Sequence, residues 1–185
     1  MVGATGKIGA ALTEAFETQH EVVRASHTRS ALTVDLADSE SIRRLYAKVG
    51  RVDAVVCATG PAAFGPLLAL TDTDFAFSLS NKLMGQVNLV RFGVEGVADG
   101  GSFTLISGAQ SRHPMPGGAA ISLVNAGLEG FVRAAALELP RGVRINVVSP
   151  SPFREMIPAG VVQAYIQAVE GHITGQVLDV AANAG

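Results

Sequence analysis

Apolar residues recur along the chain in two alternating patterns. Between residues 7 and 19 they lie three or four positions apart, from Ile8 to Phe16, which predicts a helix with one buried face. The same spacing predicts helices over 39–49, about 71–97, 119–139 and 161–169. Short apolar runs predict strands over 21–25, 31–36, 52–58, 102–107, 143–148 and 176–180.

Strands that alternate with helices indicate the α/β class, with a parallel sheet covered by helices on both faces. The run over 52–58 is almost continuously apolar, which is typical of a strand buried on both faces. Thr71 and Asp74 have the spacing of a capping box at the start of the long helix. The 185 residues contain no repeat or linker, so we expect a single domain over 1–185. A ligand of such a doubly wound sheet binds at the carboxyl ends of the strands.

Composition narrows the function classes. Apolar residues make up 48% of the chain and charged residues 16%, which excludes a disordered chain. The net charge of -2 comes without a basic stripe, so we expect no nucleic-acid partner. Cys57 is the single cysteine and the four histidines are scattered, so we expect neither an internal disulfide nor a metal site. The longest uncharged run, 54–71, contains prolines and glycines; we expect no membrane partner and a cytoplasmic protein.

The first segment that carries chemistry is Val2-Gly3-Ala4-Thr5-Gly6-Lys7-Ile8-Gly9, which opens the first predicted helix. Glycines let the backbone turn tightly and approach a phosphate, and the helix amino terminus offers N–H groups with a partial positive charge. The alternative is an ordinary turn between a strand and a helix. The segment predicts a phosphate site formed by Gly3, Thr5, Gly6, Lys7, Ile8 and Gly9.

Six further segments follow in an order that resembles the short-chain dehydrogenase/reductase family over nearly the whole chain. They are Asp35-Leu36, Cys57-Ala58-Thr59-Gly60, Asn81 in the fourth helix, 101–107 ending at Ser107, 144–150 ending at Pro150, and 174–177. The resemblance implies a Rossmann-like fold that binds a nicotinamide dinucleotide and an unknown substrate. It also implies that Asn81 and Ser107 are catalytic, and that the cofactor contacts Asp35, Leu36, Ala58, Thr59, Gly60 and Pro150.

The residues after the second strand favour NADP over NAD. An acidic residue about 20 positions beyond the glycine loop would bind the ribose 2′-hydroxyl of NAD. This chain has Ser26, His27 and Arg29 there instead, and an arginine is suited to a 2′-phosphate. The alternative is that Arg29 is a solvated loop charge.

The family's working acid is a tyrosine four residues before a lysine on the fifth helix, where the lysine also holds the nicotinamide ribose. At these positions the chain has Ile121 and Asn125, and the family's serine falls on Gly108, one step from Ser107. A positioned acid or base contributes roughly 10² to 10⁴ in rate. His113 in the preceding loop is a candidate replacement acid.

Three functions therefore stay open. The first is an NADP-dependent oxidoreductase that acts on a carbonyl or an alcohol with non-standard catalytic residues. The second is a catalytically inactive sensor or interaction module that binds the cofactor. The third is a fold retained for its subunit interface, because the resemblance implies a homodimer or homotetramer formed through the fourth and fifth helices.

Two segments are short for this family. Only Met1 and Val2 precede the glycine loop, where a strand of ~5–6 residues is usual, so a complete first strand would need residues upstream of Met1. The segment 151–160 is also short for a cover over the substrate.

Overall fold

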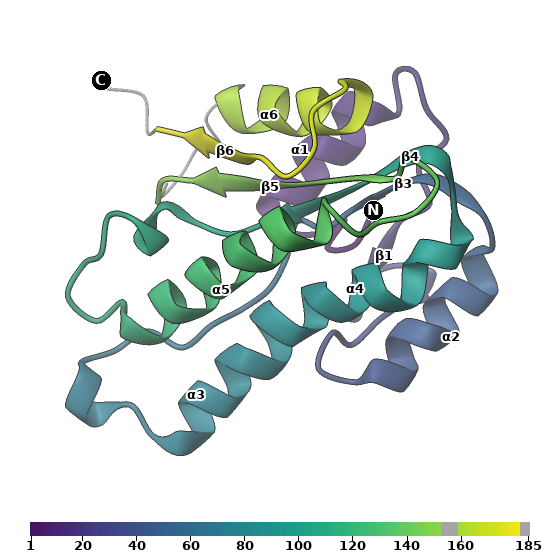
Figure 1. Cartoon of the computed structure of the whole chain (residues 1–185). Coiled ribbons are helices and arrows are strands. Elements are labelled where there is room, and N and C mark those ends of the chain that lie inside the picture. The colour runs from purple at the N-terminus through teal and green to yellow at the C-terminus, as the bar shows by residue number, and fades with distance from the viewer. Residues whose placement is uncertain (153–158, 182–185) are drawn as a thin grey trace.

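A computed structural model describes residues 1–152 and 159–181 and contains the predicted parallel sheet (Figure 1). Its strands lie in the order β2-β1-Val2-β3-β4-β5-β6, where Val2 forms single bridges to Ala25 on one side and Cys57 on the other. All of the pairings are parallel. The strands are β1 (Ala25–Ser26), β2 (Leu32–Thr33), β3 (Val52–Val56), β4 (Val97–Ile106), β5 (Arg144–Pro150) and β6 (Val177–Val180). The order confirms the doubly wound, Rossmann-like α/β class.

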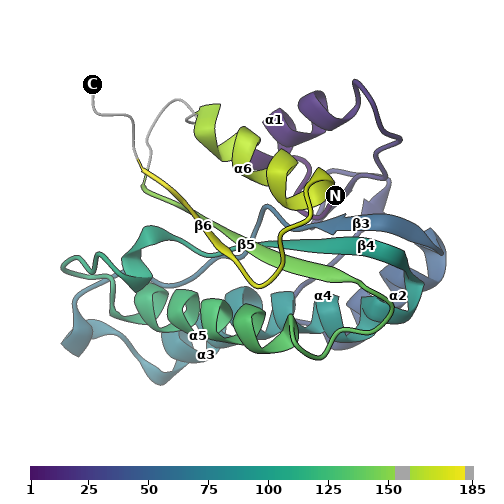
Figure 2. The same cartoon turned by 45° about the horizontal axis from the view of Figure 1, so that its top comes forward.

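Helices cover both faces of the sheet (Figure 2). On one face lie α1 (Lys7–Phe16) and α6 (Ala159–Glu170), which bury Leu12 and Tyr165 against the sheet. On the other face lie α2 (Ser39–Val49), α4 (Gly85–Gly93) and α5 (Ala119–Ala135), which bury Ile42, Leu89 and Leu128. None of the helices within residues 1–152 and 159–181 is long and apolar enough to cross a bilayer.

The predicted helix over 71–97 is divided into several pieces. The Thr71–Asp74 capping box is present and starts α3 (Asp72–Ser78). A π-helical turn, Leu79–Met84, then joins α3 to α4, and a 3-10 turn follows α4. Residues 97–101, expected to be the end of the helix and a loop, belong instead to β4. Such π-helical turns are rare and frequently lie at functional sites.

The strands predicted over 21–25 and 31–36 are much shorter than expected, because each contains only two residues. The extended segment beside residues 21–25 is Met1 and Val2, in which Val2 forms only isolated bridges to Ala25 and Cys57. Met1 and Val2 are hydrogen-bonded on both sides: Val2 N–H donates to Val56 O at 2.7 Å, and Ala25 N–H donates to Met1 O at 2.8 Å. Residues 21–25 and β3 border a groove.

This groove has a volume of about 900 Å³ and lies between residues 21–25 and β3, at the amino end of the sheet. Apolar side chains such as Val23, Val52 and Val55 line it, and the Met1 ammonium lies at its end, where it donates to Val23 O at 2.9 Å. Burial lowers the pKa of this ammonium, because the charge is removed from water.

We expect that four β-branched apolar residues added before Met1 will raise the melting temperature by roughly 5 °C or more. Each such residue would bury apolar surface and pair its backbone with β3, and 1 kcal/mol corresponds to about 2–4 °C in a domain of this size. Scanning calorimetry measures the effect. A Gly-Ser-Gly-Ser extension of equal length is the control, and equal melting temperatures for the two extensions would contradict the prediction.

Candidate dinucleotide and catalytic site

A second groove, of about 410 Å³, lies where the glycine loop meets the loops that follow β1, β2 and β3. It brings together many residues that the sequence analysis selected from separate segments. Those that line it are Gly3, Thr5, Gly6, Ser26, His27, Arg29, Asp35, Leu36, Thr59 and Asn81. Six of the other selected residues do not line the groove: Lys7, Ile8, Gly9, Ala58, Gly60 and Pro150. Ser107 also lies outside it.

The shape of the glycine loop depends on close backbone contacts. Gly3 has φ +85°, and a Cβ atom there would lie 2.7 Å from the Cβ of Thr59. A Cβ atom on Gly9 would lie 1.9 Å from the carbonyl oxygen of Gly3, so Gly9 lets α1 start directly against the loop. Gly6, by contrast, is the residue before α1 and faces the groove, with its nearest such contact at 3.4 Å. Among the described residues, no side chain caps the amino terminus of α1.

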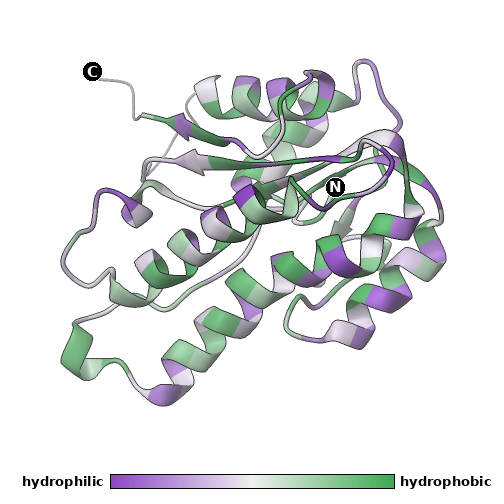
Figure 3. Cartoon of the chain, in the orientation of Figure 1, coloured by the Kyte–Doolittle hydropathy of each residue, from purple (hydrophilic) through white to green (hydrophobic). Residues whose placement is uncertain are grey.

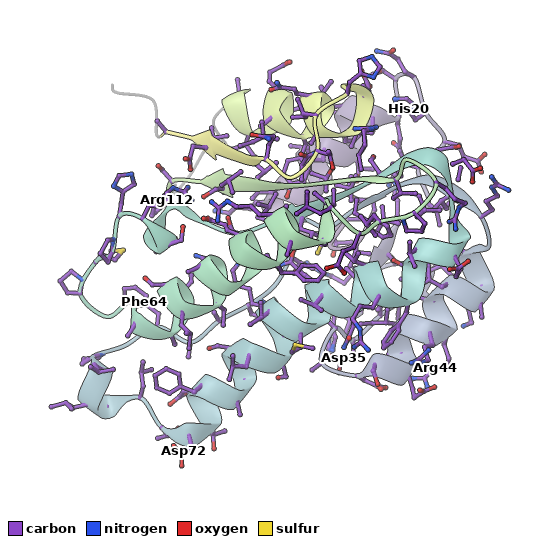
Figure 4. All side chains as sticks on the ribbon, in the orientation of Figure 1. His20, Asp35, Arg44, Phe64, Asp72 and Arg112 are labelled. Atoms are coloured by element: carbon purple, nitrogen blue, oxygen red, sulfur yellow. The ribbon has the colours of Figure 1, made fainter. Side chains whose placement is uncertain are left out.

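At the other end of the groove, a five-residue loop joins β1 to β2 and carries the residues chosen for cofactor preference. The backbone N–H of Arg29 donates to Ser26 Oγ at 3.0 Å, and the Arg29 guanidinium lies 3.5 Å from the carbonyl of Thr5. His27 Nε2 is 3.9 Å from Asp35 Oδ2, and both side chains are well exposed. Figure 4 shows Asp35 beside α2, far from Arg112 at the ends of β5 and β6. An exposed arginine, a serine and a histidine thus border one end of the groove.

The π-helical turn separates the environments of two adjacent residues. Asn81 lines the groove, and its amide donates to the carbonyl of Phe77 at 3.0 Å. Lys82 is buried, and its Nζ donates to the carbonyl of Ser107 at 3.4 Å. Its stem packs on Gly60, where a Cβ atom would lie 3.2 Å from Lys82 Cγ. The sequence analysis missed Lys82; the signal was the spacing of Ser78, Lys82 and Gln86, polar residues four positions apart that all face inward.

Gln86 holds this turn against the end of β4. Its amide nitrogen donates to the carbonyls of Ile106 and Lys82, at 2.9 and 3.1 Å, and its amide oxygen accepts from the N–H of Ile106 at 2.9 Å. Burial lowers the pKa of the Lys82 ammonium to about 8. No carboxylate within residues 1–152 and 159–181 forms an ion pair with it. The turn therefore carries a cation whose charge is not compensated.

The positions of the family's serine and lysine are occupied by a packed set of amides. Asn125 is fully buried on α5, and its amide nitrogen is 3.5 Å from Gln110 Oε1. A Cβ atom on Gly108 would lie 2.7 Å from Gln110 Oε1 and 2.9 Å from Asn125 Nδ2. Gly108 thus makes room for these two side chains, and a serine there would collide with them. The oxygen of the Asn125 amide has no hydrogen-bond partner in the described part of the chain.

Ser107 has a different environment from the one expected for a catalytic hydroxyl. Its Oγ donates to the buried carboxylate of Glu129 at 3.0 Å, and Ser111 donates to the same carboxylate at 2.7 Å. Arg112 pairs with Glu129, donates to Ser149 Oγ at 2.8 Å, and also pairs with Asp179. This network fastens the ends of β4, β5 and β6 together. The Arg112 guanidinium thus forms ion pairs with both carboxylates of the network, those of Glu129 and Asp179.

The two tyrosines are held in the packing and supply no replacement acid, and His113 stays a candidate. The hydroxyl of Tyr165 donates to the carbonyl of Cys57 at 2.8 Å, and that of Tyr46 to the carbonyl of Leu89 at 2.7 Å. Burial raises the pKa of both phenols, well above the usual value for Tyr165. His113 is exposed in the loop after β4. Both tyrosines therefore serve the packing of helices on the sheet.

Comparison with known proteins defines the class. A family model described as enoyl-(acyl carrier protein) reductase matches residues 7–181. The chain belongs to the short-chain dehydrogenase/reductase family, which confirms the resemblance seen in its sequence.

Two solved structures share the fold over almost the whole chain. The crystal structure of a Listeria innocua protein, 39% identical, matches with a TM-score of 0.92 and covers 97% of this chain and 96% of that chain. A small-chain dehydrogenase solved in complex with NADPH, 25% identical, matches with a TM-score of 0.88 and covers 97% of this chain and 94% of that chain.

Curated relatives are more distant. An uncharacterized NAD-dependent oxidoreductase of Mycobacterium tuberculosis is 30% identical over 142 residues, which are 70% of this chain and 52% of that protein. A cyclic-di-GMP-binding biofilm dispersal mediator protein of Escherichia coli is 28% identical over 172 residues, 82% of this chain and 71% of that protein. The chain thus spans about half the length of the Mycobacterium relative.

The glycine contacts give a direct test of the loop. We expect Gly9→Ala to lower the free energy of unfolding by about 2 kcal/mol or more, because its Cβ would overlap the Gly3 carbonyl. Gly6→Ala is the matched control and should leave stability within about 0.5 kcal/mol, because its added methyl group faces the groove. Urea unfolding followed by circular dichroism measures both. Equal stabilities of the two variants would show that the loop can move away from α1.

Proposed function

We propose that this chain binds a nicotinamide dinucleotide, with NADP preferred over NAD, and is an oxidoreductase that acts on a carbonyl or an alcohol with non-standard catalytic residues. The observation that carries the proposal is the groove of about 410 Å³, in which ten residues selected from five sequence segments lie together. The alternative of an inactive sensor or interaction module is not favoured by the comparisons, in which proteins described as oxidoreductases and dehydrogenases recur.

The residues of the groove fit the parts of a dinucleotide. The uncapped amino terminus of α1 and the bare backbone of Gly3 and Gly6 suit the diphosphate, because backbone N–H groups and the helix dipole favour an anion. The first turn of α1 would support the site through Lys7, Ile8 and Gly9. Gly9 packs closely against the glycine loop, and Ile8 anchors the helix in the core. Asp35 and Leu36 would border the adenine. Ala58, Thr59, Gly60 and Pro150 would border the nicotinamide half.

The preference for NADP rests on the loop between β1 and β2. Arg29 carries an exposed guanidinium at the groove, and Ser26 and His27 add hydrogen-bonding groups beside it. Guanidinium and phosphate form strong paired hydrogen bonds. The NADPH-bound relative supports this preference, whereas the Mycobacterium relative is described as NAD-dependent.

The bound cofactor would supply the hydride, and the chain would supply binding, orientation and a proton. Asn81, on the wall of the groove, would donate its amide N–H to a polar atom of the ligand. Ser107 would act as a positioning residue, because its hydroxyl is bonded to Glu129 and its carbonyl holds Lys82.

Titration calorimetry with NADPH and NADH tests the cofactor proposal. We expect tighter binding of NADPH, and we expect Arg29→Ala to weaken NADPH binding by about 10- to 100-fold, the equivalent of one charged hydrogen-bonding partner. Binding of NADH should change less than about threefold, because it lacks the 2′-phosphate. Arg44→Ala, which alters an exposed arginine paired with Asp38 outside the groove, is the control. Equal losses for the two cofactors would contradict the role of Arg29, and no binding of either cofactor would contradict the proposed function.

We also propose a homodimer, or a homotetramer, formed through the helices on one face. Phe77, Met84 and Leu123 are large apolar side chains of α3, the π-helical turn and α5, and each is more than 40% exposed. Figure 3 shows hydrophobic colour along this part of the molecule, including the 3-10 turn Leu67–Ala69. Exposed apolar residues that recur on neighbouring helices are typical of an interface between subunits.

Light scattering after gel filtration tests the assembly. The wild-type chain of 19.0 kDa should elute at twice or four times that mass. Leu123→Glu should shift the protein toward the monomer, because a carboxylate would be buried in the interface. Leu137→Glu, at an exposed position beyond the end of α5, should leave the mass unchanged. A monomeric wild-type protein would exclude this interface.

A further inference from the structure

Two buried polar side chains at the end of β4 are unexplained by the packing of the sheet: Lys82 and Asn125. We propose that they act together on the bound dinucleotide. Lys82 supplies from the fourth helix the ammonium that holds the nicotinamide ribose and donates the reaction's proton, while Asn125 supplies a neutral amide from the fifth. This inference rests on the proposed function, because it assigns the groups that would act on the bound dinucleotide and its substrate.

The two side chains flank one peptide. Lys82 Nζ donates to the carbonyl oxygen of Ser107 at 3.4 Å. Asn125 Nδ2 lies 2.9 Å from the position that a Cβ atom on the next residue, Gly108, would take. The ammonium and the amide therefore approach the same turn of backbone from two different helices. The resemblance places the family's lysine on the fifth helix, at Asn125, whereas this chain has a buried lysine on the fourth helix, next to the Asn81 that matches the family's asparagine.

The location of Lys82 also suits a ligand of the groove. Its neighbour in sequence, Asn81, lines the groove, and its stem lies against Gly60, in the loop that follows β3. The absence of a side chain at Gly60 leaves room for the stem, because a Cβ atom there would lie within 3.3 Å of three atoms of Lys82 and Gln86. Gln86 fixes the turn by three hydrogen bonds, so the position of the ammonium is predetermined.

The charges around Lys82 leave it able to exchange a proton near neutral pH. Cys57, which directly follows β3, interacts with Lys82, and its thiol has its pKa raised by burial to about 11 and is neutral at pH 7. On α5 the carboxylate of Glu129 is bonded to Ser107, Ser111 and Arg112 rather than to Lys82. Burial lowers the pKa of Lys82 to about 8, which is suited to a general acid.

The side-chain amide of Asn125 can form further hydrogen bonds at the same turn of backbone. Its oxygen is buried and lacks a partner within the described residues, although such an atom is normally hydrogen-bonded. Its nitrogen contacts Gln110 at 3.5 Å, a long distance for a hydrogen bond. An acceptor that is held in position without a donor is suited to a ligand hydroxyl, such as a ribose hydroxyl.

The reaction that this pair supports is the reduction of a carbonyl. A bound reduced nicotinamide would supply the hydride to the carbonyl carbon, and Lys82 Nζ would donate the proton to the carbonyl oxygen, so that the products would be an alcohol and the oxidised cofactor. Lys82 is then a neutral amine and regains its proton from solvent. Ile121, which stands at the family's tyrosine position, takes no part in this transfer.

An exchange experiment tests the proposal by calorimetric titration with NADPH. Lys82→Asn should weaken binding at least tenfold, because the site loses its ammonium. Asn125→Lys should also weaken it, because two ammonium groups would repel each other. The double variant Lys82→Asn with Asn125→Lys should recover binding to within about threefold of the wild type, because the amine has returned to the fifth helix.

A double variant that binds NADPH as weakly as Lys82→Asn would overturn the proposed role of this pair. So would a Lys82→Asn protein that binds as tightly as the wild type. Failure of the wild-type chain to bind NADPH would instead refute the proposed function itself, so the two failures are distinguishable.

The pH dependence separates this role from a structural one. Affinity of the wild type for NADPH should fall as the pH rises through about 8, where Lys82 loses its proton, and Lys82→Met should lack this step. Lys82→Met should also melt at a higher temperature at pH 7, because it removes a buried charge. The difference should narrow between pH 8 and 10.5, since over that range the unfolded chain binds more protons than the folded one and the wild type becomes relatively more stable. A Lys82→Met protein that is less stable than the wild type at pH 7 would indicate a structural lysine and contradict the proposal.

Discussion

The structure depends on two residues of extended backbone. Met1 and Val2 are hydrogen-bonded to the chain before and within β1 on one side and to the end of β3 on the other, so they join the two halves of the sheet. The chain then turns at Gly3, and α1 begins within van der Waals contact of that turn because Gly9 has no side chain. The position of the glycine loop, and with it the groove, follows from this short link. Because Val2 pairs only through single bridges, few ladder hydrogen bonds form on this side of β1.

A second constraint positions the inner wall of the site. The Gln86 side chain pairs with both backbone groups of Ile106, as a neighbouring strand would, and so binds the helix to the end of β4. The π-helical turn immediately before Gln86 places Lys82 inside and Asn81 at the groove. The charged side chains near the carboxyl end of β4 are thereby divided between two environments. Lys82 is buried against the carbonyl of Ser107 and forms no ion pair with a carboxylate among the described residues, whereas Glu129 and Arg112 pair with one another.

Much of the fold could be predicted from the sequence because it depends on local signals. The capping box of α3, the range of α2 and the apolar run of β3 are examples in which spacing and residue type decide the structure. The lengths of β1 and β2 could not be predicted, because they depend on a distant partner strand. The sequence analysis did not select Lys82, since a regular helical phase does not reveal a π-helical turn. For Ser107 the hidden factor was Glu129, a residue 22 positions away whose carboxylate engages the hydroxyl.

The resemblance places the family's serine and lysine at Gly108 and Asn125, and both positions are packed against neighbouring side chains. Gly108 is small where Gln110 and Asn125 fill the space, and Asn125 is neutral where Lys82 already brings a positive charge to the adjacent carbonyl. A lysine at both positions would place two ammonium groups around one peptide, which is unfavourable in a buried site. The identities of residues 82, 108 and 125 are therefore coupled. A methionine at position 82 would avoid the cost of burying a lysine ammonium, for which the described residues supply no carboxylate partner. That cost supports the proposal that Lys82 meets a ligand.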